Sequence, residues 1–395
     1  MIPRTKVNYT LSHLIRALFT TENGRDYRSH LIGLLRNYFD EKNILLTPSG
    51  RGALYYILMA TDKCRVLIPA YTCNAVVEAA LLAGKEVVFA DIERDGFNMD
   101  VSGLESVVDE RTAIVATHQF GIPCDIERIM EIGRAKGALV IEDAAASLGS
   151  RVRGKLTGTF GDVSFFSFDS TKLINVPLKG GFIIARDPLF LQKIESIRRQ
   201  VAKPMPLWVK LNLLLQAALL VAIANPVLYR IFYLIVFSFR DKYIAESAVL
   251  STILNRHYLN DLANWQAFIA SAQISEIDRI IRDRQGKYAW YRQKLSCCSA
   301  FELPPTDREG NWSTIRFPIR IRGDKFAYYR RAAQRGIDFA FSFTFIVCPE
   351  KFVNARNLAH RILDVPFYSR LSGAERERVV SVLTSLESGV RHENG

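Results

Sequence analysis

The sequence has no Cys-x-x-Cys pair, no histidine spacing typical of a metal site, and no uninterrupted apolar segment at its start. Its six cysteines are scattered over 395 residues, which favours a reduced, cytoplasmic setting over a disulfide framework. The first twenty residues are amphipathic and lack the apolar core of a signal peptide, so secretion is not predicted. Internal repeats, low-complexity tracts and nucleic-acid-binding modules are also missing. We therefore expect neither a metal site nor a nucleic-acid partner.

The composition is that of a globular protein, with 49% hydrophobic and 23% charged residues. A chain of this length can bury a large core and is expected to form two lobes. The formal net charge is +12 and the pI is near 9.4. Such a charge favours anionic partners, which are nucleotide phosphates, nucleic acid or an acidic membrane surface. The lack of a nucleic-acid-binding module leaves the first and the last of these.

Short apolar runs alternate with helical periodicity in the first half of the chain. Between several runs the apolar residues recur at about 3.6-residue spacing and end on a glycine suited to a helix C-terminus. This alternation predicts an α/β fold with a mainly parallel sheet covered by helices on both faces. The expected strands are 65–70, 86–92, 112–118, 138–144, 162–168 and 181–186.

The second half of the chain predicts a smaller α+β lobe. One long amphipathic helix is expected at 264–295, followed by a strand at 313–321 and helices at about 324–335 and 373–387. We divide the chain into a large domain at 1–205, a hydrophobic helical insertion at 206–245, and a long helix with a C-terminal small domain at 246–395.

Polar residues just after the predicted strands mark the candidate site, because ligands of such sheets bind at the carboxyl ends of strands. These residues are His118, Asp143 and the loop from Ser167 to Lys172. Asp143 ends a very apolar strand, where a carboxylate is costly unless it meets a cation or a strong donor. A carboxylate that caps the next helix is an equally simple interpretation. Lys172 has the residue type of an amine nucleophile once its pKa is lowered by burial or a nearby cation.

A small glycine-containing turn, Gly50-Arg51-Gly52, opens a predicted helix at 47–58. Free backbone N–H groups and the helix dipole favour anions at such a turn, and Arg51 adds a positive charge. Taken alone, most turns of this kind are simple helix caps. Together with Lys172, Asp143 and Ser167, however, the turn completes the set of groups that pyridoxal 5'-phosphate (PLP) requires.

Three segments, in this order, resemble the DegT/DnrJ/StrS family of sugar aminotransferases, which are fold-type-I PLP enzymes. They begin VLIPAYTCNAVVEAALLAGK (from 66), THQFGIPCDIERIM (from 117) and GTFGDVSFFSFDSTKLINVPLKGG (from 158). Two C-terminal segments, from 266 and from 361, are similar as well, and only about 200–255 falls outside the resemblance. The resemblance implies that Lys172 is the Schiff-base lysine and Asp143 the partner of the pyridinium nitrogen. It also implies that Ser167 and Gly50–Gly52 hold the phosphate, and that the enzyme is a homodimer.

The chain departs from the family pattern at several positions. Cys73 stands where an aromatic ring usually stacks on the cofactor, and Ala146 stands where a polar residue usually follows the aspartate. Arg51 replaces the usual threonine. Asn260 is the single, weak counterpart of an Asn-Tyr-Arg segment that reaches the neighbouring subunit's cofactor. These departures put the substrate in question more than the cofactor.

Residues 206–243 form a hydrophobic insertion that the family does not predict. Asn225-Pro226 should break its helix, and the halves 211–224 and 227–239 each span about 20 Å, short of a ~30 Å hydrocarbon core. A single crossing would also place Lys172 and the later helix on opposite sides of a membrane. The segment is therefore either an in-plane or re-entrant membrane hairpin, which its basic flanks favour, or a helical hairpin buried against protein.

The resemblance implies an aminotransferase that converts a keto-sugar, either nucleotide-linked or lipid-linked, to an amino sugar with glutamate as donor. Such a step belongs to polysaccharide or glycoconjugate biosynthesis, and we expect a cytoplasmic enzyme associated with the membrane face. Two alternatives stay open at this point. One is a PLP enzyme with another reaction or a non-sugar or lipid substrate, and the other is a non-catalytic membrane-associated relative.

Overall fold

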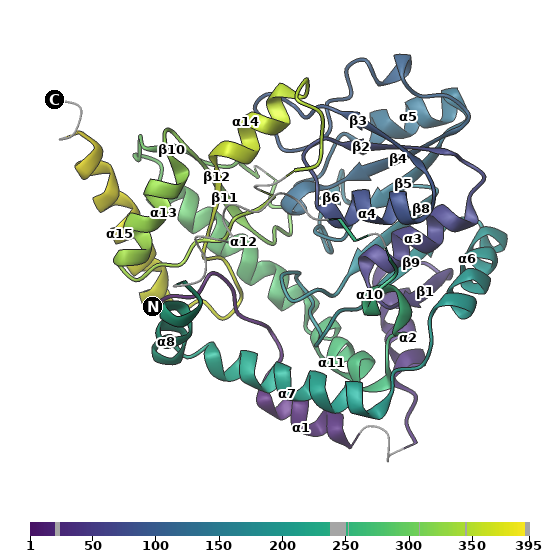
Figure 1. The fold of residues 1–395 in the computed structure, drawn as a ribbon, viewed down its shortest axis with the longest axis horizontal. Helices are drawn as coiled ribbons and strands as arrows, with labels where there is room; N and C mark the ends of the chain where they lie inside the picture. The colour runs from purple at the N-terminus through teal and green to yellow at the C-terminus, as the bar shows by residue number, and fades with distance from the viewer. Residues whose placement is uncertain (20–23, 238–249, 252, 308, 344–345, 392–395) are drawn as a thin grey trace.

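The computed structural model describes residues 1–19, 24–237, 250–251, 253–307, 309–343 and 346–391. A seven-stranded sheet forms the centre of the large lobe (Figure 1). Its strands, in spatial order, are β1 (Ile44–Thr47), β9 (Gly181–Ala185), β8 (Val163–Ser167), β5 (Leu139–Asp143), β4 (Thr112–Thr117), β2 (Arg65–Pro69) and β3 (Glu86–Ala90). The pairs from β3 to β8 are parallel, whereas β9 runs antiparallel to both β8 and β1. The predicted α/β fold with a mainly parallel sheet is confirmed.

Alternating residues of the strands bury two separate cores, as the two-residue period of a strand requires. On one face Leu45 and Ile183 pack with α3, α4 and α6, and on the other Leu46 and Phe182 pack with α1, α2, α7 and α11. The helices of the large lobe are α1 (Leu11–Leu18), α2 (Tyr27–Phe39), α3 (Gly50–Ala60), α4 (Asn74–Leu82), α5 (Ile126–Lys136), α6 (Pro188–Val201), α10 (Arg256–Leu259) and α11 (Asn264–Ile274).

The small lobe packs helices on a three-stranded antiparallel sheet, in the order β10-β11-β12 (Figure 1). Its elements are α12 (Ile277–Lys294), β10 (Phe301–Glu302), β11 (Phe317–Ile321), α13 (Lys325–Gln334), α14 (Val353–Arg361), β12 (Ile362–Val365) and α15 (Gly373–Arg391). Short pieces complete the fold, namely the 3₁₀ turns η1 (Leu104–Ser106) and η2 (Gln119–Gly121) and the hairpin β6 (Arg151–Val152)–β7 (Lys155–Leu156).

The single long helix predicted at 264–295 is wrong, because the structure contains two helices, α11 and α12, that meet at Ser275 and Glu276. The Ser275 hydroxyl donates to the backbone oxygen of Ser271 at 3.0 Å, a bond that competes with the helix ladder and bends helices. This break matters for the lobes, since α11 packs in the core beneath the large sheet. The division of the chain at 205 and 245 stays a prediction, and α11 lies beyond the second of those boundaries.

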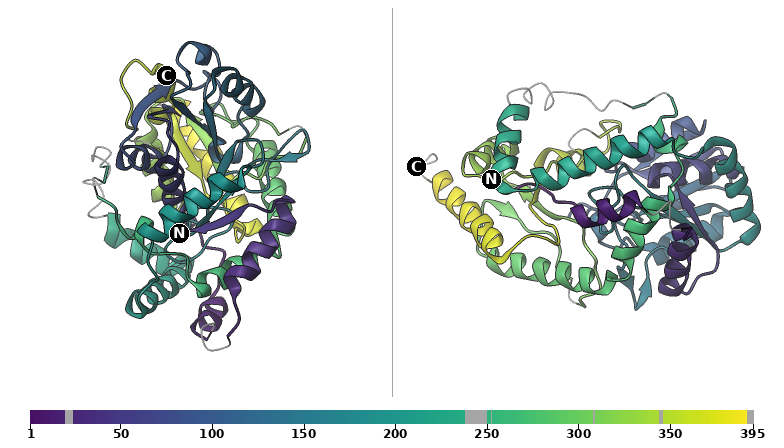
Figure 2. Two further views of the ribbon diagram at one scale, coloured as in Figure 1. Left: turned by 90° about the vertical axis from the view of Figure 1, so that its right-hand side faces the viewer. Right: turned by 90° about the horizontal axis from the view of Figure 1, so that it is seen from below.

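The hydrophobic insertion forms two helices, α7 (Leu207–Ile223) and α8 (Pro226–Phe237), bent by 109° at the predicted Asn225-Pro226 break. Among the described residues no single helix is long and apolar enough to span a membrane. The two helices of this bent pair reach that length and apolar composition only when they are taken together. Figure 1 and the view from below in Figure 2 both place α7 beside α1. The rest of the insertion, 238–245, lies outside the described residues together with its basic residues Arg240 and Lys242.

Each helix of the insertion has one packed face and one exposed face. Leu213, Leu214 and Ala217 of α7 belong to the core beneath the large sheet. Tyr229 of α8 donates to the carboxylate of Asp338 in the small lobe at 2.5 Å. The opposite faces expose large apolar side chains, which are Leu207, Trp208, Leu211, Leu215, Leu219 and Leu220 on α7, and Val227, Leu228, Ile231, Phe232, Leu234 and Ile235 on α8. The insertion is thus half buried, and its packing combines features of both sequence interpretations.

Candidate active site

A cavity of about 200 Å³ opens at the carboxyl ends of the central strands. Its wall is formed by the end of β5, the loop after β8, the starts of α3 and α4, and parts of the small lobe. Six of the seven residues predicted for the site line it, namely Gly50, Arg51, Cys73, Asp143, Ser167 and Lys172. Ala146, the departure noted after the aspartate, also lies in the wall. The strand order therefore gathers residues up to 122 positions apart (50 to 172) in one place.

Lys172 and Asp143 form an electrostatic pair in this cavity. Burial lowers the pKa of the Lys172 amine, and the carboxylate of Asp143 opposes that shift. Burial raises the pKa of the Asp143 carboxyl. Two groups oppose this shift, namely the charge of Lys172 and the N–H of Ala145, which donates to Oδ1 at 3.0 Å. A buried lysine with a lowered pKa has a larger fraction of free amine and is a better nucleophile.

The N-terminus of α3 faces the cavity through Gly50. A Cβ on Gly50 would lie 2.9 Å from the Cβ of Ser167, so the close approach of these two predicted phosphate ligands requires glycine. Gly52, in contrast, does not line the cavity. Its N–H donates to the Oγ of Ser49 at 3.0 Å as a helix cap, and Ser49 donates to the backbone oxygen of His257. The phosphate-binding role of Gly52 stays a prediction, although its N–H already has the Oγ of Ser49 as acceptor.

The charge of Arg51 is balanced within the protein. Its Nη1 lies 3.1 Å from Oε1 of Glu78, which also accepts the hydroxyl of Tyr258 at 2.7 Å. Arg51 therefore lines the cavity as half of an ion pair. Cys73 is the N-cap residue of α4 and makes no side-chain cap bond. Asn260 lies away from the cavity lining, at the end of α10, where its backbone pairs with Lys203.

Sequence reasoning missed the aromatic part of the wall. Phe120 and Phe343 line the cavity with their ring centroids 6.3 Å apart and their planes within 9° of parallel. Both have positive φ, at 60° and 44°, a conformation that bulky residues rarely adopt and that tends to occur at functional sites. No sequence signal joins these two residues, because they come from different lobes and positive φ leaves no mark in residue type.

Charged residues of the wall were missed as well. Asp169 pairs with Lys179 at 3.2 Å, and Arg316 of the small lobe pairs with the buried Asp364 at 3.0 Å. In addition, the buried hydroxyl of Thr72 lines the cavity and has no hydrogen-bond partner among the described residues. A buried polar atom of this kind is satisfied by a ligand or by water.

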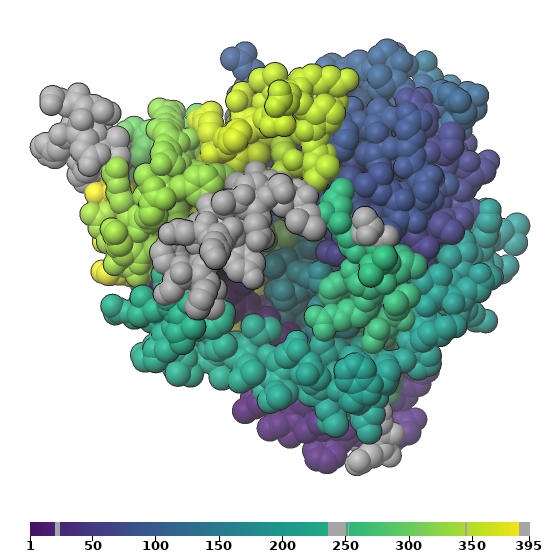
Figure 3. Space-filling view, viewed as in Figure 1, coloured from purple at the N-terminus to yellow at the C-terminus, as the bar shows by residue number. Residues whose placement is uncertain are grey.

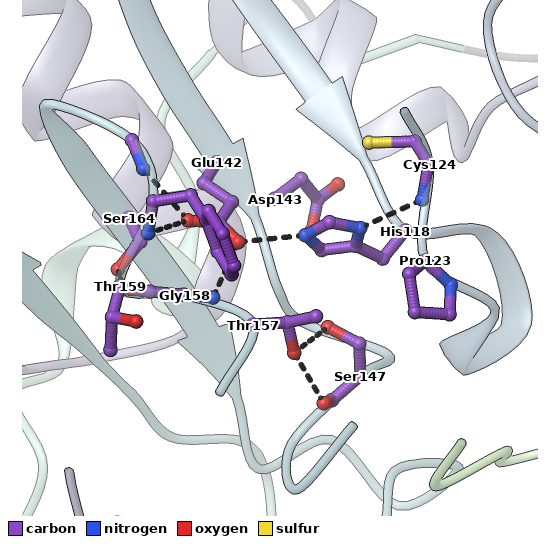
Figure 4. A network of polar contacts seen from close by, with 12 residues as sticks. His118, Pro123, Cys124, Glu142, Asp143, Ser147, Thr157, Gly158, Thr159 and Ser164 are labelled. Carbon is purple, nitrogen blue, oxygen red and sulfur yellow. Dashed lines mark hydrogen bonds and ion pairs between the residues drawn. The ribbon is translucent and has the colours of Figure 1, made fainter. Parts of the chain in front are cut away.

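His118, one of the polar residues predicted at the strand ends, is fully buried and does not line the cavity. Figure 4 shows its ring between Cys124 and Glu142. The backbone N–H of Cys124 donates to its Nδ1 at 3.0 Å, so the ring proton is on Nε2, which donates to Oε1 of Glu142 at 2.8 Å. Glu142 also accepts the backbone N–H groups of Gly158, Phe160 and Gly161. These bonds lower the pKa of Glu142 although burial alone would raise it. The network fixes the end of β5, and with it the adjacent Asp143.

The comparison with known families identifies this arrangement. A model of the DegT/DnrJ/EryC1/StrS aminotransferase family matches residues 13–212 and 256–384. The chain belongs to this family. The unmatched stretch between those ranges, 213–255, begins within α7 and includes all of α8.

Two curated relatives of this chain have names that refer to sugars. A GDP-perosamine synthase from Escherichia coli O157:H7 is 34% identical over 168 residues, or 40% of this chain and 46% of the relative. A UDP-N-acetyl-3-dehydro-alpha-D-glucosamine 3-aminotransferase from Acidithiobacillus ferrooxidans is 33% identical over 154 residues, or 38% of this chain and 42% of the relative. The chain thus spans less than half the length of these two relatives.

Solved structures match nearly the whole chain. PseC from Helicobacter pylori, an aminotransferase of pseudoaminic acid biosynthesis, superposes with a TM-score of 0.77 at 16% identity, covering 98% of this chain and 99% of its own. NtdA from Bacillus subtilis, solved with the bound cofactor PMP, gives a TM-score of 0.73 at 18% identity, covering 98% of this chain and 84% of its own. These matches confirm the fold expected for the family.

The cavity fits the cofactor expected for this family. Lys172 offers a buried amine, Asp143 a carboxylate beside it, and the start of α3 with Ser167 an anion site. The unpartnered hydroxyl of Thr72 adds a further donor. Within the described residues no group of three or more His, Cys, Asp or Glu side chains is arranged to hold a metal ion.

Proposed function

We propose that the protein is a PLP-dependent aminotransferase that converts a keto-sugar to an amino sugar. The observation that supports this most is the pairing of Lys172 and Asp143, two buried groups of opposite charge, in the cavity of a chain that belongs to an aminotransferase family. The names of the relatives favour a nucleotide-linked sugar as substrate. We further propose glutamate as amino donor and a role in cell-surface polysaccharide or glycoconjugate biosynthesis.

Each group of residues in the cavity has a separate role in the proposed reaction. When bound, PLP supplies an electron sink for carbanion chemistry. Lys172 would hold the cofactor through its amine and would act as the base that moves a proton at the substrate carbon bearing the nitrogen. Asp143 would supply a negative charge for the cofactor's ring nitrogen, and the N-terminus of α3 with Ser167 would hold the phosphate. The wall of Phe120 and Phe343 excludes water from the reacting groups.

Three elements of the proposal concern the setting of the enzyme. We propose a homodimer, and we place the enzyme in the cytoplasm at the membrane surface. The exposed apolar faces of α7 and α8 support the position at the membrane surface, because the two helices are bent and partly packed as an in-plane hairpin would be. The insertion then brings the cavity close to a lipid-linked substrate or product.

Reduction of the holoenzyme with borohydride, followed by peptide mapping, tests the cofactor assignment. We expect the cofactor fixed on Lys172 and its visible absorbance lost in Lys172→Ala. Lys179 is the matched control, since it lines the same cavity and its charge is paired with Asp169. A label on Lys179, or no label, contradicts the assignment. Glutamate consumption with a panel of nucleotide-linked keto-sugars then tests the reaction, and turnover of non-sugar ketones alone contradicts it.

A further inference from the structure

A second, larger cavity lies between α8, the first residues of the chain, α13 and α15, away from the active-site cavity. Its volume is about 790 Å³. Four arginines line it, Arg230 from α8, Arg330 and Arg335 at α13, and Arg378 from α15. Residues from three separate parts of the sequence thus bring positive charge to one opening.

Ion pairs among the described residues leave most of the positive charge of this cavity unbalanced. Among the described residues no carboxylate forms an ion pair with Arg230, Arg335 or Arg378, and Arg330 has only an exposed contact of 3.9 Å with Asp324. Glu375, the one acidic residue of the lining, is already bound by Lys6 at 3.0 Å and by the backbone N–H of Ser372. Arg378 donates to the backbone oxygen of Arg335 at 3.3 Å, a bond that leaves its charge unpaired. Arginines with no carboxylate partner, or only a distant exposed one, favour an anion with several oxygen acceptors, such as a phosphate.

The surroundings of the cavity are apolar. Leu234 belongs both to its wall and to the exposed apolar face of α8, where 59% of the residue is accessible. Val227, Ile231 and Ile235 continue that face, and α7 and α1 lie next to it along the lower edge of the surface in Figure 3. A free phosphate ion uses only the arginines. An amphiphile uses the arginines and the apolar face together.

The charge pattern of the sequence points in the same direction. Residues 1–20 and 206–239 contain five basic residues, Arg4, Lys6, Arg16, Lys210 and Arg230, and no Asp or Glu. Arg4 and Lys6 are paired with Asp338 and Glu375, whereas Arg16 and Arg230 have no carboxylate partner among the described residues. A second copy of the chain at this surface would place like charges opposite one another. An anionic bilayer has the complementary charge, and basic clusters beside apolar helices bind such surfaces.

We propose that the arginine cavity binds the phosphate headgroup of an anionic glycerophospholipid while α7 and α8 lie in the plane of the bilayer surface. The proposal rests on the membrane setting suggested under the proposed function and adds a defined headgroup site to it. Arg230 occupies the boundary between the two environments, with its guanidinium at the cavity and its helix neighbours in the apolar face.

Flotation of the full-length holoenzyme with vesicles tests the proposal. One set of vesicles contains phosphatidylcholine alone, and the other contains added phosphatidylglycerol. We expect clear preference for the second set. The triple variant Arg230→Gln, Arg335→Gln, Arg378→Gln should lose on the order of 100-fold in affinity for it, at about tenfold or less per arginine near a charged surface.

A matched triple variant removes the same charge elsewhere, with Arg128→Gln, Arg134→Gln and Arg153→Gln, all exposed in or near α5. We expect this control to keep most of the binding. An equal loss in both triple variants means that only total charge matters and overturns the headgroup site. Binding of inorganic phosphate or glycerol phosphate as tight as vesicle binding, measured by calorimetry, identifies a free anion as ligand and also overturns it.

The membrane setting is tested separately with Leu211→Gln, Leu215→Gln, Leu219→Gln. Loss of binding to both vesicle types in this variant supports the setting, and no vesicle binding by the wild type contradicts it. If the wild type binds vesicles with and without phosphatidylglycerol equally well, the headgroup site is contradicted but the membrane setting is not. A decrease from dimer to monomer caused by the leucine variant means that a second copy covers the face and contradicts both. Transaminase activity on soluble substrates should be unchanged in all variants, because none of the residues lines the active-site cavity.

Discussion

The substitution Glu142→Gln is predicted to destabilise the protein strongly without touching the active-site cavity. Both carboxylate oxygens of Glu142 accept two N–H donors each, from His118 and Gly158 on one side and from Phe160 and Gly161 on the other. An amide keeps one acceptor oxygen and turns its own N–H₂ toward the other pair of donors, whichever way it is placed. Two buried N–H groups then lose their acceptor, at about 1–3 kcal/mol each.

The expected loss of unfolding free energy is therefore about 2–6 kcal/mol. We would measure it by urea unfolding of the cofactor-free protein, so that ligand binding does not shift the midpoint. The matched control is Glu131→Gln, an exposed residue paired only with Arg128, for which we expect a change within about 0.5 kcal/mol. Equal effects of the two substitutions would refute the role of the network.

The pH dependence follows from the pKa of Glu142, which is lowered from its ordinary value of 4.5 because hydrogen bonds from His118 and the backbone outweigh burial. A carboxyl with a lowered pKa in the folded state stabilises the protein fully above its unfolded pKa and loses that contribution as pH falls through the folded value. The difference in stability between wild type and Glu142→Gln should therefore be constant from neutral pH to about pH 5 and shrink below about 4.5. A difference that grows on acidification contradicts this reasoning.

Two further predictions concern the active site and the neighbouring strand β9. Asp143→Asn should keep the cofactor on Lys172 but lower kcat by about 100-fold or more, because an amide cannot hold a charge opposite the ring nitrogen; steady-state kinetics with saturating cofactor measures it, and unchanged kcat contradicts the assigned role. Gly181→Ala should cost about 1–3 kcal/mol, since its Cβ would lie 2.4 Å from the backbone oxygen of Phe166. Gly286→Ala in α12, where a Cβ meets no atom within 4 Å, is the control and should be neutral or stabilising in the same urea titration.

Much of the large lobe could be predicted from the sequence, because the signals that define it are local. The strand at 139–143 is a run of apolar residues that ends on Asp143, and the glycine-containing turn at Gly50 opens a helix as expected. Sequence spacing and the resemblance to a family of known arrangement then identified Lys172 and Ser167. Lys172 and Ser167 meet Asp143 in one cavity because β8, which ends on Ser167 and precedes the loop of Lys172, is the neighbour of β5, which ends on Asp143.

The features that could not be predicted depend on tertiary contacts. The break between α11 and α12 contains no proline or glycine, and the apolar pattern runs through it. The exclusion of Gly52 from the cavity depends on a hydrogen bond to Ser49 that no residue pattern reveals. Likewise, the partners of Glu142 are backbone groups, which any sequence supplies. The helix break, the position of Gly52 and the partners of Glu142 all depend on long-range geometry rather than on residue type.

The insertion is fastened to both lobes, since α7 is part of the core beneath the large sheet and α8 is bonded to Asp338 of the small lobe. A segment that lies only on the surface of a fold can be deleted without exposing the core beneath it. Here a deletion would uncover part of one hydrophobic core and leave a buried carboxylate with fewer donors in the other. Loss would require compensating substitutions in both lobes at once. We therefore expect descendants of this protein to retain α7 and α8 even where the surface that the helices serve has changed.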